Sequence, residues 1–409
     1  MGKRIVITGM GVISPLGFGR EAFWKSLLEA RSAIAPIQGL DVSQYGAKLG
    51  GELKGFKAED FLGKKGLRYL NWGTKMLTSA VKLAIDDAKL EATDEFGDKT
   101  GIVIGSALAN YPQTTNYTQM AMSRGPEDLM PMESYDVALN ASINFVSVWF
   151  KMKPFARTIA SGFTSSLDAI ADAAELLRQG AADIVVAGGV EQFSIDAYLL
   201  FYWQKMLAGQ KPDGNLNHEV NHPFGADRNG FVLSEGSYVV VLEELESAKQ
   251  RGATIYAEVA GQSSLYIGNR KFTEAQKIDK TSRTMRAALN ESNVEPEKLC
   301  FVCAAANSSK DIDVIEAKAL RRSGINAPVN ALKSLTGECY GAAGSLQVVA
   351  SALALKDQTI PPSAVDYEIE DGLNLNLVRK SANANIETVL IDALDPQGNA
   401  SCLVLKRPV

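Results

Sequence analysis

Residues 158–189 read TIASGFTSSLDAIADAAELLRQGAADIVVAGG, and this stretch decides the fold. An apolar run opens the stretch, and apolar residues then recur at helical spacing over residues 163–179. Gly180 is placed to cap that helix, and a second apolar run follows at residues 183–187. The order predicts a strand, a sharp turn, a helix and another strand. This is the layout in which a turn delivers a nucleophile to the start of a helix, yet the residue at the tip is Gly162.

Strand-like and helix-like runs alternate along the whole chain, which predicts an α/β fold. The pattern restarts near residue 250, so we expect two halves, residues 1–250 and 251–409. No low-complexity linker separates them, and we therefore expect the halves to share one core. Strands are expected at residues 4–8, 101–105, 155–160, 183–187, 238–242, 254–260, 300–305, 388–394 and 401–405, and helices at residues 74–90, 163–179, 273–289, 311–322 and 341–355.

The composition excludes several classes of function. The 409 residues are 46% hydrophobic and 22% charged, which is ordinary for a soluble globular protein. A net charge of −5 and a pI of about 5.4 give no electrostatic support for a nucleic-acid partner. No run approaches the ~18 apolar residues of a membrane span, and the first residues, MGKRIVITGMGVISPLG, are too short and glycine-broken for a signal peptide. We expect a cytoplasmic protein with no membrane partner.

The four cysteines do not predict a disulfide framework in a chain of this length. Cys300 and Cys303 have the CxxC spacing, but no second CxxC and no histidine pair lies near them. They fall in an apolar, strand-like run, so we interpret them as core residues. We expect neither a metal nor a cofactor.

Four further stretches make the sequence more specific. They read RIVITGMGVISPLG, DIVVAGGVEQFS, DRNGFVLSEGSYVVVLEELESAKQRGA and NALKSLTGECYGAAGSLQVVASALALKDQTIPPS. These stretches occur in the same order in β-ketoacyl-acyl-carrier-protein synthases of the KAS II type, in the thiolase superfamily, which the chain resembles over residues 4–406. The resemblance implies a duplicated, five-layered αβαβα sandwich and a dimer. It also implies catalysis by a cysteine, which accepts the acyl chain as a thioester, and by two histidines, which promote decarboxylation of malonyl carrier protein.

All three of these catalytic side chains are missing at the matching positions. The family turn of alanine, cysteine and a small residue reads SGF here, which puts Gly162 at the nucleophile position. The histidine of the Asn-Ala-His-Gly-Thr motif falls on Ala305 in FVCAAANSS. The histidine of the Lys-Ser-x-x-Gly-His motif falls on Glu338, whereas the lysine of that motif stays as Lys333. We expect Glu338 and Lys333 to form an ion pair.

The mobile Gly-Phe-Gly-Gly loop of active members is also replaced. Residues 394–399 read LDPQGN, and proline fixes a backbone that would need to swing. A complete scaffold without catalytic groups resembles the chain-length factor of type II polyketide synthases, although most such factors have glutamine at the cysteine position. The resemblance implies a heterodimer with an active ketosynthase. That partner receives malonyl-derived units from acyl carrier protein, and the pair builds a poly-β-ketone or a polyene.

The resemblance places dimer-interface residues and the end of the acyl tunnel in residues 110–132. Bulky side chains there would close the tunnel of the partner and limit the length of the product, because a filled apolar pocket resists an added group. Each of them also fits an ordinary role as a core or interface filler. The candidates are Asn110, Tyr111, Tyr117, Met120, Met122 and Met132.

Other residues in the motif stretches are expected to support the vacant site or to bind a carrier. A structural role is expected for Ser161, Phe163, Asp227, Glu235 and Lys333. Buried ion pairs and hydrogen bonds are expected in particular for Asp227, Arg228, Glu235 and Lys333. Active relatives hold the acidic carrier protein with basic residues where this chain has Lys64, Lys65 and Arg68, although a solvated helix face explains these three as well.

Two other functions stay open. Ser161 or a nearby cysteine, Cys303 or Cys339, would make the chain an atypical acyltransferase. A serine nucleophile needs an adjacent base, both histidine positions are empty, and the two histidines of the chain, His218 and His222, lie in a polar loop. The second alternative is a non-catalytic homodimer that holds an acyl ligand.

Overall fold

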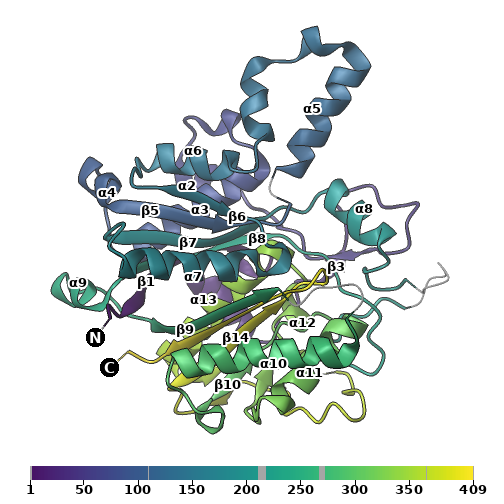
Figure 1. The fold of residues 1–409 in the computed structure, drawn as a ribbon. Coiled ribbons are helices and arrows are strands. Elements are labelled where there is room, and N and C mark those ends of the chain that lie inside the picture. The colour runs from purple at the N-terminus through teal and green to yellow at the C-terminus, as the bar shows by residue number, and fades with distance from the viewer. Residues whose placement is uncertain (1, 109, 211–217, 267–271, 365, 409) are drawn as a thin grey trace.

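The chain repeats one strand pattern twice (Figure 1). The computed structural model describes residues 2–108, 110–210, 218–266, 272–364 and 366–408. The strands of the first half are β1 (Ile5–Ser14), β5 (Thr100–Gly105), β6 (Ala156–Ile159), β7 (Ile184–Glu191) and β8 (Gly236–Glu244). Those of the second half are β9 (Ala257–Tyr266), β10 (Phe301–Cys303), β11 (Val329–Asn330), β14 (Thr388–Leu394) and β15 (Asn399–Lys406).

Both halves have the same topology. The order β6-β5-β7-β8-β1 of the first half corresponds to β11-β10-β14-β15-β9 in the second. In each half the first two pairings are parallel and the next two are antiparallel. The halves join where β1 pairs with β9, so one sheet runs through the molecule.

Helices complete a five-layered sandwich, as the family resemblance implied. Between the two halves of the sheet, α7 (Ser165–Arg178) packs against α13 (Ala343–Asp357). The outer face of the first half is covered by α3 (Trp72–Asp87) and α6 (Ala141–Trp149), and that of the second by α10 (Glu274–Glu291) and α11 (Lys310–Arg322). The central α13 is buried on every side because small and aliphatic residues surround its axis, whereas α10 buries only one face.

The two halves share one core. A single cluster of buried side chains includes Ile5, Leu167, Leu346 and Leu403, which come from both halves and from both central helices. The remaining helices are α1 (Arg20–Leu28), α2 (Glu59–Leu62), α4 (Asp94–Lys99), α5 (Tyr111–Arg124), α8 (Ile195–Trp203), α9 (Leu245–Gln250) and α12 (Lys333–Thr336). The short strands are β2 (Gly17–Phe18), β3 (Ala35–Pro36), β4 (Leu49–Gly50), β12 (Thr359–Ile360) and β13 (Ala382–Asn383).

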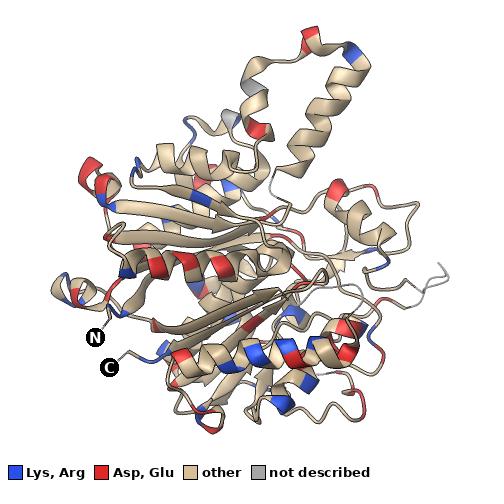
Figure 2. Cartoon of the chain, viewed as in Figure 1, with Lys and Arg blue, Asp and Glu red and all other residues tan. Residues whose placement is uncertain are grey.

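One segment, residues 110–140, stands away from the body, and we call it the arm (Figure 1). It consists of α5 followed by the 3-10 segments Pro126–Asp128 and Pro131–Val137. No side chain of α5 is buried, and Arg124 is its single charged residue. Figure 2 shows a largely uncharged arm, in contrast to the mixed charges on the outer face of α10.

In the described residues, no helix combines the length and apolar character that crossing a membrane requires.

Candidate functional site

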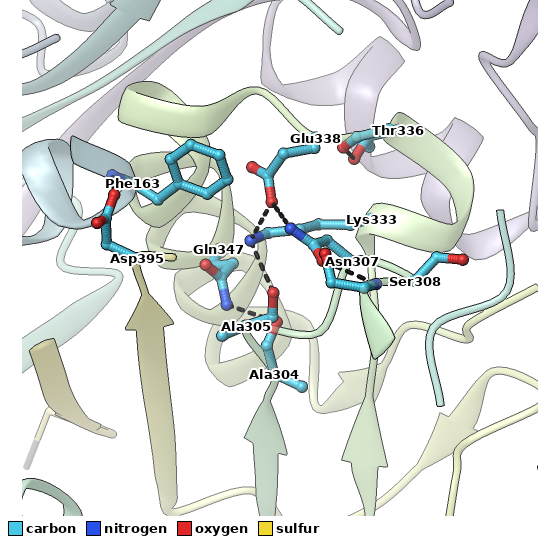
Figure 3. A network of polar contacts seen from close by, with 12 residues as sticks. Phe163, Ala304, Ala305, Asn307, Ser308, Lys333, Thr336, Glu338, Gln347 and Asp395 are labelled. Carbon is cyan, nitrogen blue, oxygen red and sulfur yellow. Dashed lines mark hydrogen bonds and ion pairs between the residues drawn. The ribbon is translucent and has the colours of Figure 1, made fainter. Parts of the chain in front are cut away.

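The turn between β6 and α7 places an aromatic ring in the vacant site. Gly162 has φ +72°, in the left-handed region that favours glycine, and a 3-10 turn, Gly162–Thr164, leads into α7. A Cβ on residue 162 would lie 2.1 Å from Asp395 Oδ2, so the backbone leaves no room for a side chain there. The next side chain, Phe163, enters the site, and its ring lies between Asp395 and Glu338 in Figure 3.

The sequence singles out Gly162 for the nucleophile position, whereas the side chain that faces the two histidine positions belongs to Phe163. The physical reason is the direction of the chain at the turn. Positive φ at Gly162 bends the backbone, so that the following residue opens the helix and points inward. Neither Gly162 nor Phe163 has a nucleophilic side chain.

Asp395 occupies the place where this turn would otherwise offer a hydrogen-bond donor. Its Oδ2 accepts a hydrogen bond from the Phe163 backbone N–H at 2.9 Å, and its Oδ1 accepts one from the Gln397 N–H at 2.6 Å. Backbone N–H groups at helix starts stabilise an oxyanion in acyl transfer. Here that donor is satisfied by a carboxylate of the same chain, and the next residue, Pro396, has no N–H to give. Burial raises the pKa of Asp395.

Glu338 belongs to a buried ion pair (Figure 3). Its Oε2 accepts hydrogen bonds from Lys333 Nζ at 2.9 Å and from Asn307 Nδ2 at 2.7 Å. Lys333 Nζ also donates to the Ala305 carbonyl at 2.8 Å, so the lysine ties the two histidine positions together. Lys333 and Glu338 have almost no exposed surface. The geometry of the pair therefore fits a structural role, in which each charge compensates the other.

Two buried acids beneath this network were not identified from the sequence. Glu316 on α11 and Asp392 on β14 both face the Ala305 N–H, at 2.8 and 3.3 Å. Burial, and then the mutual repulsion of the two carboxylates, raise the pKa of Glu316 well above its usual value. Burial also raises the pKa of Asp392, to about 6. An acid in the otherwise apolar run of residues 388–394 is the one signal that the sequence offers.

The other residues that were expected to support the vacant site differ in burial and in their partners. Asp227 is not buried: its side chain is 56% exposed and pairs with His222 Nδ1 at 2.9 Å, because the loop turns it outward. The neighbouring Arg228 points inward instead and pairs with Glu370. Glu235 is buried, and among the residues that the structure describes no cation pairs with it. Its carboxylate accepts hydrogen bonds from the indole N–H of Trp72 and from the backbone N–H groups of Leu53 and Phe193.

Hydrogen bonds hold Ser161 in place, and burial opposes ionisation of the two cysteines near the site. Ser161 Oγ donates to Asp168 Oδ2 at 2.5 Å and accepts from Thr164 Oγ1 at 3.1 Å. Burial raises the pKa of Cys303 to about 12 and that of Cys339 well above its usual value. A thiol must ionise to attack, so the local environment of both cysteines opposes nucleophilic chemistry.

The interface candidates fall into an exposed set and a buried one. Tyr111 is 52% exposed and Met122 is 83% exposed, whereas Tyr117 and Met120 are half-buried beside a cavity of about 520 Å³ on the arm. Asn110 is buried and donates to the Ala138 carbonyl at 3.0 Å. The side chain of Met132 lies outside the described part of the chain.

Two further regions complete the surroundings of the site. The basic residues Lys64, Lys65 and Arg68 are exposed at the surface. A cavity of about 970 Å³ opens beside the vacant site, and residues 394–398 form part of its wall. Within the described residues, no group of three or more histidine, cysteine or acidic side chains is placed to hold a metal ion.

Comparisons with known proteins agree with this architecture. The family models for the N-terminal and C-terminal domains of β-ketoacyl synthase match residues 2–248 and 256–365. The 3-oxoacyl-[acyl-carrier-protein] synthase 2 of Coxiella burnetii and that of Vibrio cholerae are each 30% identical over 99% of both chains.

Two solved structures cover the whole chain. The ishigamide ketosynthase/chain length factor matches with a TM-score of 0.88 and 26% sequence identity. A β-ketoacyl synthase from Burkholderia phymatum matches with a TM-score of 0.88 and 25% sequence identity. Each of these alignments covers 100% of both chains. Because both domain models match in order along the same fold, the chain belongs to the β-ketoacyl synthase family.

Proposed function

We propose that this chain is a non-catalytic ketosynthase subunit, a chain-length factor, that pairs with an active ketosynthase. In that pair it would shape the tunnel in which a poly-β-ketone or polyene grows on acyl carrier protein. One observation carries the proposal. A complete ketosynthase scaffold holds Phe163, Ala305 and an ion-paired Glu338 around the site that needs a cysteine and two histidines.

The chemistry of the site supports a silent subunit. A phenyl ring cannot form a thioester, and a methyl group at Ala305 cannot move a proton. Glu338 Oε2 already accepts two hydrogen bonds, one of them from a lysine. The atypical acyltransferase is less well supported, because no histidine lies at either family position to serve as the base that Ser161 requires.

Two surfaces support a partner subunit. The arm exposes apolar side chains that water does not stabilise: Tyr111, Met122, Met130, Tyr135 and Leu139. In the described residues, β6 also ends the sheet order, so one of its hydrogen-bonding edges has no neighbouring strand. Open edges invite a further strand. One similar structure contains a ketosynthase/chain length factor, which is the pairing proposed here.

A co-purification experiment tests the proposal. The tagged chain is expressed with a ketosynthase of the same source that retains cysteine and both histidines, and the complex is sized and identified by mass spectrometry. We expect a 1:1 heterodimer and, after incubation with malonyl carrier protein, acylation only on the cysteine of the partner. A self-paired dimer that ignores the ketosynthase would overturn the proposal, and an acyl group on Ser161 would favour the acyltransferase.

A further inference from the structure

Two side chains, Asp395 and Phe163, lie between the cavity beside the vacant site and a buried cluster of aromatic rings. The cavity of about 970 Å³ is the opening beside the vacant site, and Asp395, Pro396 and Gly398 belong to its wall. Directly behind Asp395 stands Phe163, which is 4% exposed. The hydrogen bond from the Phe163 N–H to Asp395 Oδ2 holds the ring and the carboxylate against each other.

Behind Phe163 the interior is filled with further aromatic rings. The centroid of Phe163 lies 5.7 Å from that of Phe201, 5.9 Å from that of Phe231 and 6.3 Å from that of Tyr340. Phe201 contacts Phe231 and Tyr340 in turn, at 5.3 and 5.6 Å. All four rings are buried, and four of these five contacts have the edge-to-face geometry that aromatic pairs prefer. The exception is the tilted contact between Phe163 and Tyr340.

We infer that Phe163 and Asp395 form a plug that excludes acyl thioesters from this subunit, so that a growing chain reaches the shared interface only from the active site of the partner. The ring excludes the alkyl part by volume. The carboxylate excludes the thioester head by holding the one N–H that would bind its oxygen. The routing half of this inference rests on the proposed function, whereas the exclusion is a property of this chain alone.

Ligand binding to the purified full-length chain tests the ring. The probe is dodecanoyl-pantetheine, titrated by calorimetry into wild type, Phe163→Ala and a control, Phe23→Ala. Phe23 is equally buried but packs against Tyr238, away from the cavity. Each methylene that becomes buried strengthens binding about fourfold. Three or four methylenes in the freed space therefore make Phe163→Ala bind ~100-fold more tightly than the control.

Saturable binding to wild type, or a folded Phe163→Ala that binds no better than Phe23→Ala, would overturn the role of the ring. These outcomes are separate from the pairing experiment. A chain that excludes the probe but recruits no ketosynthase contradicts the proposed function alone, and a chain that pairs yet binds the probe contradicts the plug alone.

A thiol-labelling experiment tests the carboxylate and does not depend on the alanine variant. Phe163→Cys is compared with the double variant Phe163→Cys/Asp395→Ala for alkylation by chloroacetyl-pantetheine, in which the thiolate displaces chloride. Peptide mapping restricts the readout to residue 163. We expect the double variant to react at least tenfold faster, because removing Asp395 frees the N–H and opens the path. Equal rates would overturn the role of Asp395.

Discussion

The ion pair between Lys333 and Glu338 gives the sharpest test of a structural role for the vacant site. Replacing Lys333 with methionine keeps the length of the side chain but removes the ammonium group that contacts Glu338 Oε2 at 2.9 Å and the Ala305 carbonyl at 2.8 Å. Within the described part of the chain, the amide of Asn307 is then the one side-chain partner that Glu338 keeps. An uncompensated charge in a fully buried site costs on the order of 3–5 kcal/mol. For a protein of this size, that lowers Tm by about 3–6 °C.

The assay is a double-mutant cycle measured by thermal and chemical unfolding. Glu338→Gln alone leaves the lysine without its acid and is expected to cost a similar amount. The double variant Lys333→Met/Glu338→Gln has no buried charge, so it should lose far less than the sum of the two single changes. The control is Lys82→Met, which breaks the exposed pair with Asp86 and should cost ~0–1 kcal/mol.

Additive losses in this cycle would refute the reasoning, because additivity means that the two side chains do not depend on each other. A Lys333→Met variant as stable as Lys82→Met would refute it as well, since the site would then tolerate an unpaired buried carboxylate.

Three further predictions follow from the backbone, from a buried acid and from the arm. Gly162→Ala should lower the free energy of unfolding by several kcal/mol, because a non-glycine residue is strained in the left-handed region and its Cβ would clash with Asp395. The control is Gly63→Ala, at φ +71° with open space around it, which should lose clearly less stability in the same melt. Equal losses would contradict the clash. Burial raises the pKa of Glu191 to about 8 from an unfolded value of 4.5, so the folded state holds an extra proton and loses stability as the pH rises from about 4.5 to 8. Glu191→Gln should remove that loss. Denaturant melts at pH 5 and pH 8 would then show a difference in stability between the variant and the wild type that changes with pH in favour of the variant. A difference that is the same at both pH values would exclude a raised pKa for Glu191. On the arm, Met122→Glu should weaken the affinity for the proposed ketosynthase partner roughly 10–100-fold, which is the equivalent of leaving one side chain out of the interface. The Tm of the isolated chain should stay the same. Unchanged affinity in a pull-down titration would place the interface elsewhere.

Local patterns in the sequence suffice to predict most of the architecture. Leu167, Ile170, Ala174 and Leu177 recur every three or four residues in α7, and the apolar runs at β7 and β14 end at turn residues. Such periodicity reflects which face of an element is buried, and it can be recognised from a short segment of consecutive residues. The order of these runs also predicted that the pattern restarts near residue 250, and the two halves of the sheet repeat one strand topology.

Helix α5 on the arm could not be found in this way. Its sequence, YPQTTNYTQMAMSR, has no apolar stripe at helical spacing, because none of its side chains is buried within this chain. A helix that buries no side chain within its own chain leaves no internal burial pattern to detect. Likewise, adjacent residues Asp227 and Arg228 look alike as charged loop residues, and only the direction of the loop decides that Arg228 is buried.

The sequence by itself determined the fold class, the duplicated halves and the absence of a nucleophile and of both histidines from their motifs. Only the tertiary structure decided what fills the site. The contact between Asp395 and Phe163 joins residues 232 positions apart, and the direction of the Phe163 side chain depends on the positive φ of Gly162. Residue identities are local information, whereas backbone direction at a turn and contacts between distant segments arise only when both halves pack around one core.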